Sequence, residues 1–142
     1  MIRMKHRKFF SIFLSVVFVF LLGFGCESEM KDPKGTLEKQ AKNYWTERLI
    51  NQNFEYTYKE EDKKNLPSFS TYKEELKAVT RFRTSSVEIK EVQVEGDMGT
   101  VKLAVMCIVP GFPKKLPLPL GDQWILKGNK WRHKRQLKNP EK

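Results

Sequence analysis

The chain has 142 residues, with 27 Lys and Arg against 17 Asp and Glu and a formal net charge of +10. This length allows one domain of ordinary size and excludes a large multidomain enzyme. A basic chain commonly meets nucleic acid or anionic surfaces. The first residues of this chain read as an export signal, and an exported protein would rarely meet nucleic acid, so we do not expect nucleic acid as a partner.

The first 25 residues have the composition of a secretory leader. Four Lys and Arg within residues 1–8 precede an uncharged run of 16 residues over 9–24, which is the order of a signal peptide. As a helix this run is about 24 Å long, short of the roughly 30 Å hydrocarbon core of a bilayer. We predict a signal peptide over residues 1–25, with an uncleaved anchor over residues 9–24 as the alternative.

The leader ends in Leu22-Gly23-Phe24-Gly25-Cys26, which resembles the lipobox of bacterial lipoproteins. The resemblance implies a diacylglyceryl thioether on Cys26, with palmitate-type acyl chains, and a tether over residues 26–35. Glycine one and three residues before the cut also suits ordinary signal peptidase, so a plain exported thiol at Cys26 is the alternative. A lipidated Cys26 would exclude a disulfide with Cys107, the second cysteine of the chain.

The sequence after the tether predicts helices. Thr36 is the expected cap of a first helix, which carries an apolar stripe at helical spacing and ends near residues 51–53. A short helix or turn is expected over residues 54–58, and the charged run 59–65 reads as a solvated loop. Thr71-x-x-Glu74 matches a capping box and predicts a third helix to about residue 80. The stripe consists of Leu37, Ala41, Tyr44, Trp45 and Leu49.

From residue 86 the apolar period changes to two, which predicts strands. A phase shift at Lys90-Glu91 predicts a β-bulge that bends the sheet. The strand over residues 100–109 places Cys107 on its buried face. The Pro-rich segment 111–120 predicts a loop or sheet edge, and residues 123–127 and 130–134 predict a last hairpin.

These elements predict an α+β fold with N-terminal helices packed on a bent antiparallel sheet. The chain resembles the nuclear transport factor 2-like (cystatin-like) superfamily and its small bacterial lipoprotein members over residues 36–135. The basic segment 136–142 follows as a tail. The motifs that carry the resemblance are Ala41-x-x-Tyr44-Trp45-x-x-x-Leu49, Asn53-Phe54-Glu55-x-x-Tyr58, Val92-x-Val94-x-Gly96-Asp97-x-Gly99-x-Val101-x-Leu103 and Asp122-x-Trp124-x-Leu126-x-Gly128-x-x-Trp131-x-His133.

The resemblance implies a sheet that wraps a long helix into a cone, often with a pocket inside, and homodimers are common through the open sheet face. Enzymes of this superfamily place an Asp in the cone, often with a Tyr or His. We carry no such base over, because no Asp at a matching position is identified as a partner for His133. The candidates for lining a pocket, with the core as their alternative place, are Tyr44, Trp45, Trp124, Trp131 and His133.

His133 is the single histidine of residues 26–142, and one histidine does not supply the converging groups of a hydrolase or metal site. We expect no catalytic residues, no metal and no cofactor. The predicted function is a membrane-tethered lipoprotein of the bacterial cell envelope, inner or outer membrane, that binds a small ligand or an envelope protein. The alternatives are an enzyme with an unrecognised acid/base pair in the cone and a structural envelope protein with an uncleaved anchor.

Overall fold

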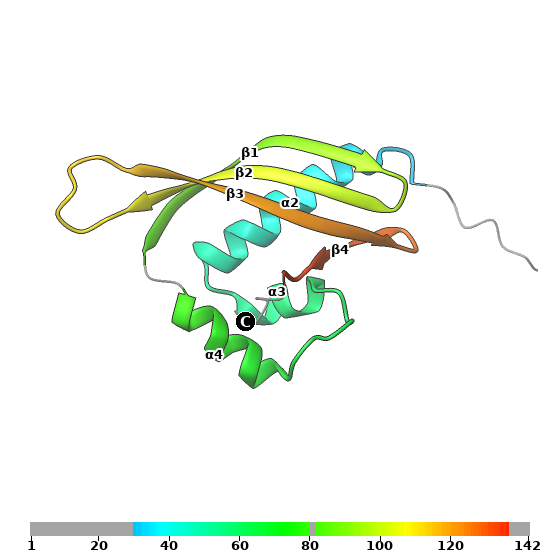
Figure 1. Ribbon diagram of the computed structural model, residues 1–142, viewed down its shortest axis with the longest axis horizontal. Coiled ribbons are helices and arrows are strands. Elements are labelled where there is room, and N and C mark those ends of the chain that lie inside the picture. The colour runs from blue at the N-terminus through cyan, green and yellow to red at the C-terminus, as the bar shows by residue number, and fades with distance from the viewer. Residues whose placement is uncertain (1–29, 80–81, 137–142) are drawn as a thin grey trace, which may run out of the picture.

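The computed structural model describes residues 30–79 and 82–136. Within these ranges three helices come first and four strands follow, the order that the sequence predicts. The long helix α2 lies along one face of the sheet, and the two short helices gather below the end of α2 (Figure 1). The chain therefore has an α+β architecture. The bounds are α2 (Pro33–Leu49), α3 (Phe54–Glu60), α4 (Phe69–Val79), β1 (Arg83–Glu95), β2 (Met98–Ile108), β3 (Leu116–Lys127) and β4 (Lys130–Lys134).

Helix α2 begins earlier than the sequence predicts. The carboxylate of Asp32 accepts a hydrogen bond from the backbone N–H of Gly35 at 2.8 Å, and Pro33 occupies the first turn. Proline suits that position because its missing N–H would have no partner there. The prediction of Thr36 as the cap is therefore wrong. Leu37, with the rest of the apolar stripe, faces the sheet as predicted.

Helix α4 also begins earlier than predicted. Its first turn starts at Phe69, and the hydroxyl of Ser68 accepts from the backbone N–H of Thr71 at 3.3 Å. Ser68 thus takes the capping role, and the prediction that Thr71 and Glu74 form a capping box is wrong. Of the two alternatives expected over residues 54–58, a short helix or a turn, the structure has the helix, α3, which is capped by Asn53.

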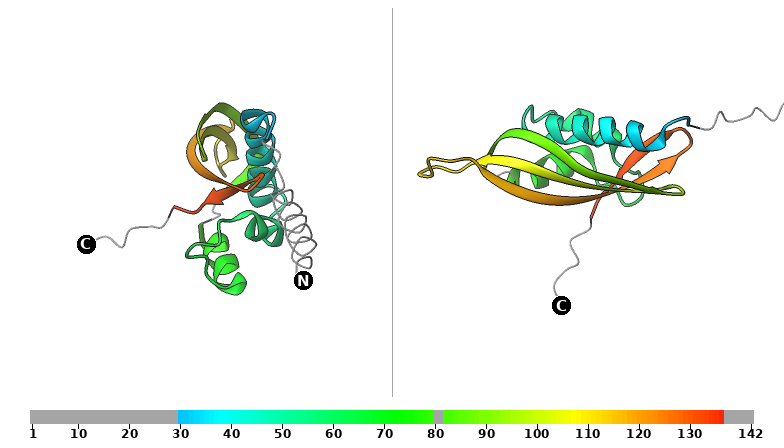
Figure 2. Two further views of the ribbon diagram at one scale, coloured as in Figure 1. Left: turned by 90° about the vertical axis from the view of Figure 1, so that its right-hand side faces the viewer. Right: turned by 90° about the horizontal axis from the view of Figure 1, so that it is seen from above.

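The sheet is antiparallel throughout, with strand order β1-β2-β3-β4. Pairing between β1 and β2 shifts register between Thr84 and Ser86 and again between Ile89 and Glu91. The second shift confirms the bulge predicted at Lys90-Glu91. The bulged sheet curls around α2, as the end-on view in Figure 2 shows. The predicted last hairpin is confirmed, because residues 123–127 of β3 pair with 130–134 of β4.

The main core lies between α2 and the concave face of the sheet. Val101, Leu103, Val105 and Cys107 alternate along β2 and are all buried, as the two-residue period predicts. Cys107 is a free thiol in this core. A second, smaller cluster joins α3 to α4 through Phe54, Tyr72 and Leu76.

β2 and β3 continue together to a projecting turn at one end of the sheet (Figure 1), and we call residues 104–119 of this end the arm. On the other side of β2, β1 pairs with the arm as far as Ile108. The predicted loop or edge over residues 111–120 is confirmed in both senses. A turn region precedes Leu116, and residues 116–120 then pair with β2 alone, because β4 reaches only residues 123–127. Four large apolar side chains of the arm are exposed: Ile108, Phe112, Leu116 and Leu118.

Several expectations concern residues outside the described ranges. These are the signal peptide over residues 1–25, the lipid site Cys26, most of the tether and the tail beyond Gln136. Among the helices of the described ranges, none combines the length and the apolar character needed to cross a bilayer.

Candidate functional site

The most polar part of the interior is a chain of three ionisable side chains centred on His133. Nδ1 of His133 lies 2.6 Å from Oε2 of Glu61, and Nε2 lies 2.7 Å from Oδ1 of Asp122. All three residues are buried, with exposed fractions of 4%, 0% and 4% for His133, Glu61 and Asp122. We call Glu61, His133 and Asp122 the buried triad.

The backbone brings the triad together from three distant segments. Glu61 follows the last residue of α3 in an extended conformation and forms an isolated parallel bridge with His133 of β4. The next residue, Asp62, donates its backbone N–H to the carbonyl of His133 at 2.8 Å. Asp122 lies on β3, on the same face of that strand as Trp124, which pairs with His133. The bridge and the hairpin register thus fix both carboxylates beside one imidazole.

Both carboxylates of the triad also accept hydrogen bonds from aromatic side chains. Oε1 of Glu61 accepts from the hydroxyls of Tyr44 at 2.6 Å and Tyr72 at 2.9 Å. Oδ2 of Asp122 accepts from the indole N–H groups of Trp45 and Trp124, each at 2.7 Å. In the described part of the chain, no buried side-chain nitrogen or oxygen lacks a hydrogen-bond partner.

The two carboxylates stabilise the charged form of the imidazole. Burial of the ring opposes its charge, but the hydrogen bonds with Asp122 and Glu61 outweigh burial and raise the pKa of His133 to about 9. Burial likewise opposes the charge of Glu61, yet the bonds from His133, Tyr44 and Tyr72 hold the pKa of Glu61 below its usual value. At neutral pH the triad therefore contains an imidazolium between two carboxylates.

This arrangement leaves His133 without basic capacity at neutral pH. An imidazolium donates from both nitrogens and has no lone pair to accept a proton, and both of its N–H groups already bond to a carboxylate. The ring also stacks on Tyr44, with centroids 4.5 Å apart and planes 24° from parallel. Burial raises the pKa of the Tyr44 hydroxyl well above 10, so this phenol stays protonated as well. In this geometry both ring N–H groups of His133 are occupied by carboxylates.

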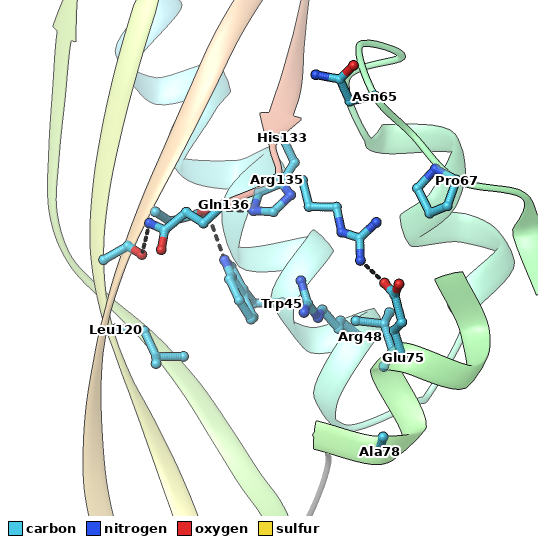
Figure 3. Close-up of a pocket in the computed structure, with 13 residues that line it drawn as sticks. Trp45, Arg48, Asn65, Pro67, Glu75, Ala78, Leu120, His133, Arg135 and Gln136 are labelled. Atoms are coloured by element: carbon cyan, nitrogen blue, oxygen red, sulfur yellow. Dashed lines mark hydrogen bonds and ion pairs between the residues drawn. The ribbon is translucent and has the colours of Figure 1, made fainter. Parts of the chain in front are cut away.

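A cavity of about 730 Å³ opens beside the triad (Figure 3). Its walls come from α2, α4, the loop before α4, β3 and the C-terminal end of the described chain. Asp122 and His133 reach its wall, as do apolar side chains from several elements. Volumes of this size are typical of small-molecule sites. The full lining is Trp45, Arg48, Asn65, Pro67, Glu75, Leu76, Ala78, Leu120, Gly121, Asp122, His133, Arg135 and Gln136.

Two arginines line this cavity, and their surroundings differ. Arg135 forms an ion pair with Glu75, and its guanidinium also lies over the ring of Tyr72. Arg48 donates to the hydroxyl of Tyr44 at 3.0 Å and lies over the ring of Trp45, 4.8 Å from the ring centroid. Among the described residues, Arg48 forms no salt bridge with a carboxylate.

The residues predicted from the sequence divide between cavity and core. Trp45 and His133 line the cavity. Tyr44, Trp124 and Trp131 are fully buried in the main core instead, each with 0% exposure.

Sequence reasoning missed both carboxylates of the triad. The prediction that residues 60–62 lie in a solvated loop is wrong for Glu60 and Glu61, which are 6% and 0% exposed, because the bridge to β4 draws them inward. Asp122 gave a usable signal, since it alternates with Trp124 on one strand face. Within the described ranges, no group of three or more His, Cys, Asp or Glu side chains is arranged to hold a metal ion.

Comparison with solved structures shows a nuclear transport factor 2 (NTF2)-like fold. A Campylobacter jejuni protein proposed to be an NTF2-like transpeptidase matches with a TM-score of 0.51 and 16% identity, covering 70% of this chain and 97% of the other. A SEC-C motif containing protein from Rhodopseudomonas palustris matches with a TM-score of 0.50 and 12% identity, covering 72% and 75%. At these identities the likeness concerns the fold alone. No protein-family model and no curated protein matches the sequence.

Proposed function

We propose that this chain is a membrane-tethered lipoprotein of the bacterial cell envelope whose NTF2-like domain binds a ligand in the cavity beside the triad without catalysing a reaction. The observation that supports binding over catalysis is the state of His133. It lies at the cavity wall, yet both of its nitrogens are committed to Asp122 and Glu61. A general base must offer a free lone pair to its substrate.

The rest of the cavity lining also favours binding. Among the described residues, its lining contains no serine, threonine or cysteine. Cys107 lies in the main core between α2 and the sheet, 6% exposed, away from this lining. The lining offers apolar surface with a few polar groups, which is the usual composition of a recognition site.

The tether is supported by the sequence. The basic start, the apolar run and Cys26 at the expected cut have the order of a lipoprotein leader. Two or three acyl chains hold a protein firmly to a membrane, since each buried CH₂ contributes about 0.8 kcal/mol. The described chain starts close to this site, with α2 beginning at Pro33.

The intact mass of protein from its native membrane fraction tests the tether. The mass of residues 26–142 plus acyl groups is expected, and a Cys26→Ala variant should lose the acyl mass. The bare mass of residues 26–142 would indicate a soluble exported protein and reopen a Cys26–Cys107 bridge. A full-length mass would indicate an uncleaved anchor over residues 9–24.

Blocking the cavity tests the binding role. Leu120 lines the cavity from β3, so Leu120→Trp should reduce its volume and abolish retention of co-purifying small molecules in native mass spectrometry. The matched control is Leu118→Trp, two residues along the same strand on the exposed arm. Equal retention by both variants, or none by the unchanged protein, would contradict the cavity as a binding site.

A further inference from the structure

We propose that the ligand of this cavity is an organic anion with one carboxylate and an apolar body, and that Arg48 recognises its carboxylate. This inference rests on the proposed function, because it assigns a ligand class to the same cavity. It depends on three features of the wall: the unused donors of Arg48, the neutralisation of the other charges and the apolar surface around them.

Arg48 has hydrogen-bonding capacity that the protein does not use. A guanidinium carries five N–H donors, and in the described ranges its one hydrogen-bond partner is the hydroxyl of Tyr44. The indole of Trp45 supports one face of the guanidinium plane, 4.8 Å away. The side chain is thus held in place, while its remaining N–H groups are available at the cavity (Figure 3).

The other charges at the wall are already matched. Glu75 pairs with Arg135. Asp122 accepts from His133 and from two indoles, so its oxygens are occupied. Arg48 is therefore the cation of the described lining that has no carboxylate bound to it. A negatively charged ligand beside Arg48 would meet unused N–H donors, and each carboxylate of the lining is already paired with a cation.

Arg48 also has an internal electrostatic role. Its hydrogen bond to Tyr44 continues through the Tyr44 hydroxyl to Glu61, so its charge stabilises the buried triad indirectly. That role uses one donor and leaves the planar fork free. A fork of parallel N–H groups matches a carboxylate in a bidentate pair, which a single ammonium does not reproduce.

The remaining wall suits an apolar body. Trp45, Pro67, Leu76, Ala78 and Leu120 contribute apolar surface around a volume of about 730 Å³, within the range typical of small-molecule pockets. One unmatched guanidinium beside that surface fits one negative charge joined to a hydrocarbon or aromatic group. A small inorganic anion would leave the apolar wall uncovered.

Calorimetric titration with a matched pair of probes tests this inference on the full chain in neutral detergent. The probes are 4-phenylbutyrate and its uncharged analogue 4-phenylbutyramide. We expect the acid to bind about tenfold more tightly than the amide. Arg48→Gln should remove that preference, and Arg48→Lys should retain only part of it, because it keeps the charge and loses the fork.

The matched control is Arg132→Gln. It removes the same charge from β4 beside His133, but Arg132 donates to the carbonyl of Lys59 and does not line the cavity. This variant should bind the acid as the unchanged protein does. Thermal unfolding of each variant establishes that it is folded, and Arg48→Lys keeps the test available where Arg48→Gln is too unstable.

The outcomes separate this inference from the proposed function. Equal binding of acid and amide, or unchanged acid binding in Arg48→Gln, would overturn the role of Arg48 while leaving ligand binding in place. Binding of neither probe would overturn the assigned ligand class, and the Leu120→Trp comparison would then judge the cavity independently. Loss of acid binding in both Arg48→Gln and Arg132→Gln would indicate general charge attraction and also overturn the inference.

Discussion

Two basic side chains line the same cavity, but they differ in how many of their hydrogen-bond donors already have a partner. His133 has both nitrogens bonded to buried carboxylates, whereas Arg48 spends one of five donors on Tyr44. By residue type, the histidine beside an Asp and a Glu resembles catalytic machinery and the arginine resembles a surface charge. Their surroundings reverse these expectations. The N–H groups of His133 are all paired within the protein, so Arg48 is the residue with donors left for a ligand.

The largest expected effect comes from removing the centre of the satisfied network. Glu61→Ala leaves the Nδ1–H of His133 and the hydroxyl of Tyr44 without their carboxylate acceptor in a buried place. The hydroxyl of Tyr72 keeps only its bond to Thr57. Breaking a buried pair in this way costs about 3–5 kcal/mol of unfolding free energy. Denaturant titration measures the loss.

Glu74→Ala is the matched control. Glu74 pairs with Lys77 on α4, and both side chains are more than half exposed. A surface pair of this kind contributes less than about 1 kcal/mol. A similar loss in both variants would show that Glu61 is no more important than a surface acid.

The second prediction concerns pH. The pKa of His133 rises from its usual 6.5 to about 9 on folding, so the stabilisation is fully present below pH 6.5 and is lost as pH rises through 9. The free energy of unfolding should fall by roughly 3 kcal/mol across that window. Denaturant titrations at several pH values measure the slope.

His133→Gln provides the control, because it removes the titrating group and should flatten the slope. In acid the sign reverses. The pKa of Glu61 is lowered on folding, so its contribution is lost as pH falls below the usual value for a glutamate. The contributions of His133 and Glu61 to the free energy of unfolding come from shared hydrogen bonds, so they are not added together. A steep slope above pH 6.5 in the variant would contradict the assignment to His133.

The smallest expected effect on stability comes from Glu75, at the rim of the cavity. Glu75→Gln breaks a partly exposed ion pair with Arg135 and should change the unfolding free energy by less than about 0.5 kcal/mol. It also releases a second guanidinium toward the cavity, so 4-phenylbutyrate should bind more tightly. Unchanged or weaker binding would indicate that Arg135 does not face the ligand.

Local patterns predicted much of the fold. The two-residue period gave the buried face of β2, and the bulge at Lys90-Glu91 followed from a one-residue shift of that period. The starts of α2 and α4 were predicted less accurately, because Asp32 and Ser68 cap them about one turn before Thr36 and Thr71.

The site was less predictable because long-range contacts build it. Glu61 lies in a charged run that reads as solvated, and its burial depends on a bridge to His133, 72 residues away. Nothing in the local sequence indicates that pairing. The burial of Asp122 could have been predicted from the sequence, because its alternation with Trp124 places it on the inner face of β3.

The free edge of the arm carries Pro117 and Pro119. Prolines two residues apart in a strand present their nitrogens along the same edge, and neither has a hydrogen to donate. An exposed edge with intact donors is a template on which copies of a protein can pair, especially when they are crowded together. Here that template is interrupted twice, so contacts with the arm depend on side chains such as Phe112 and Leu118 rather than on main-chain pairing.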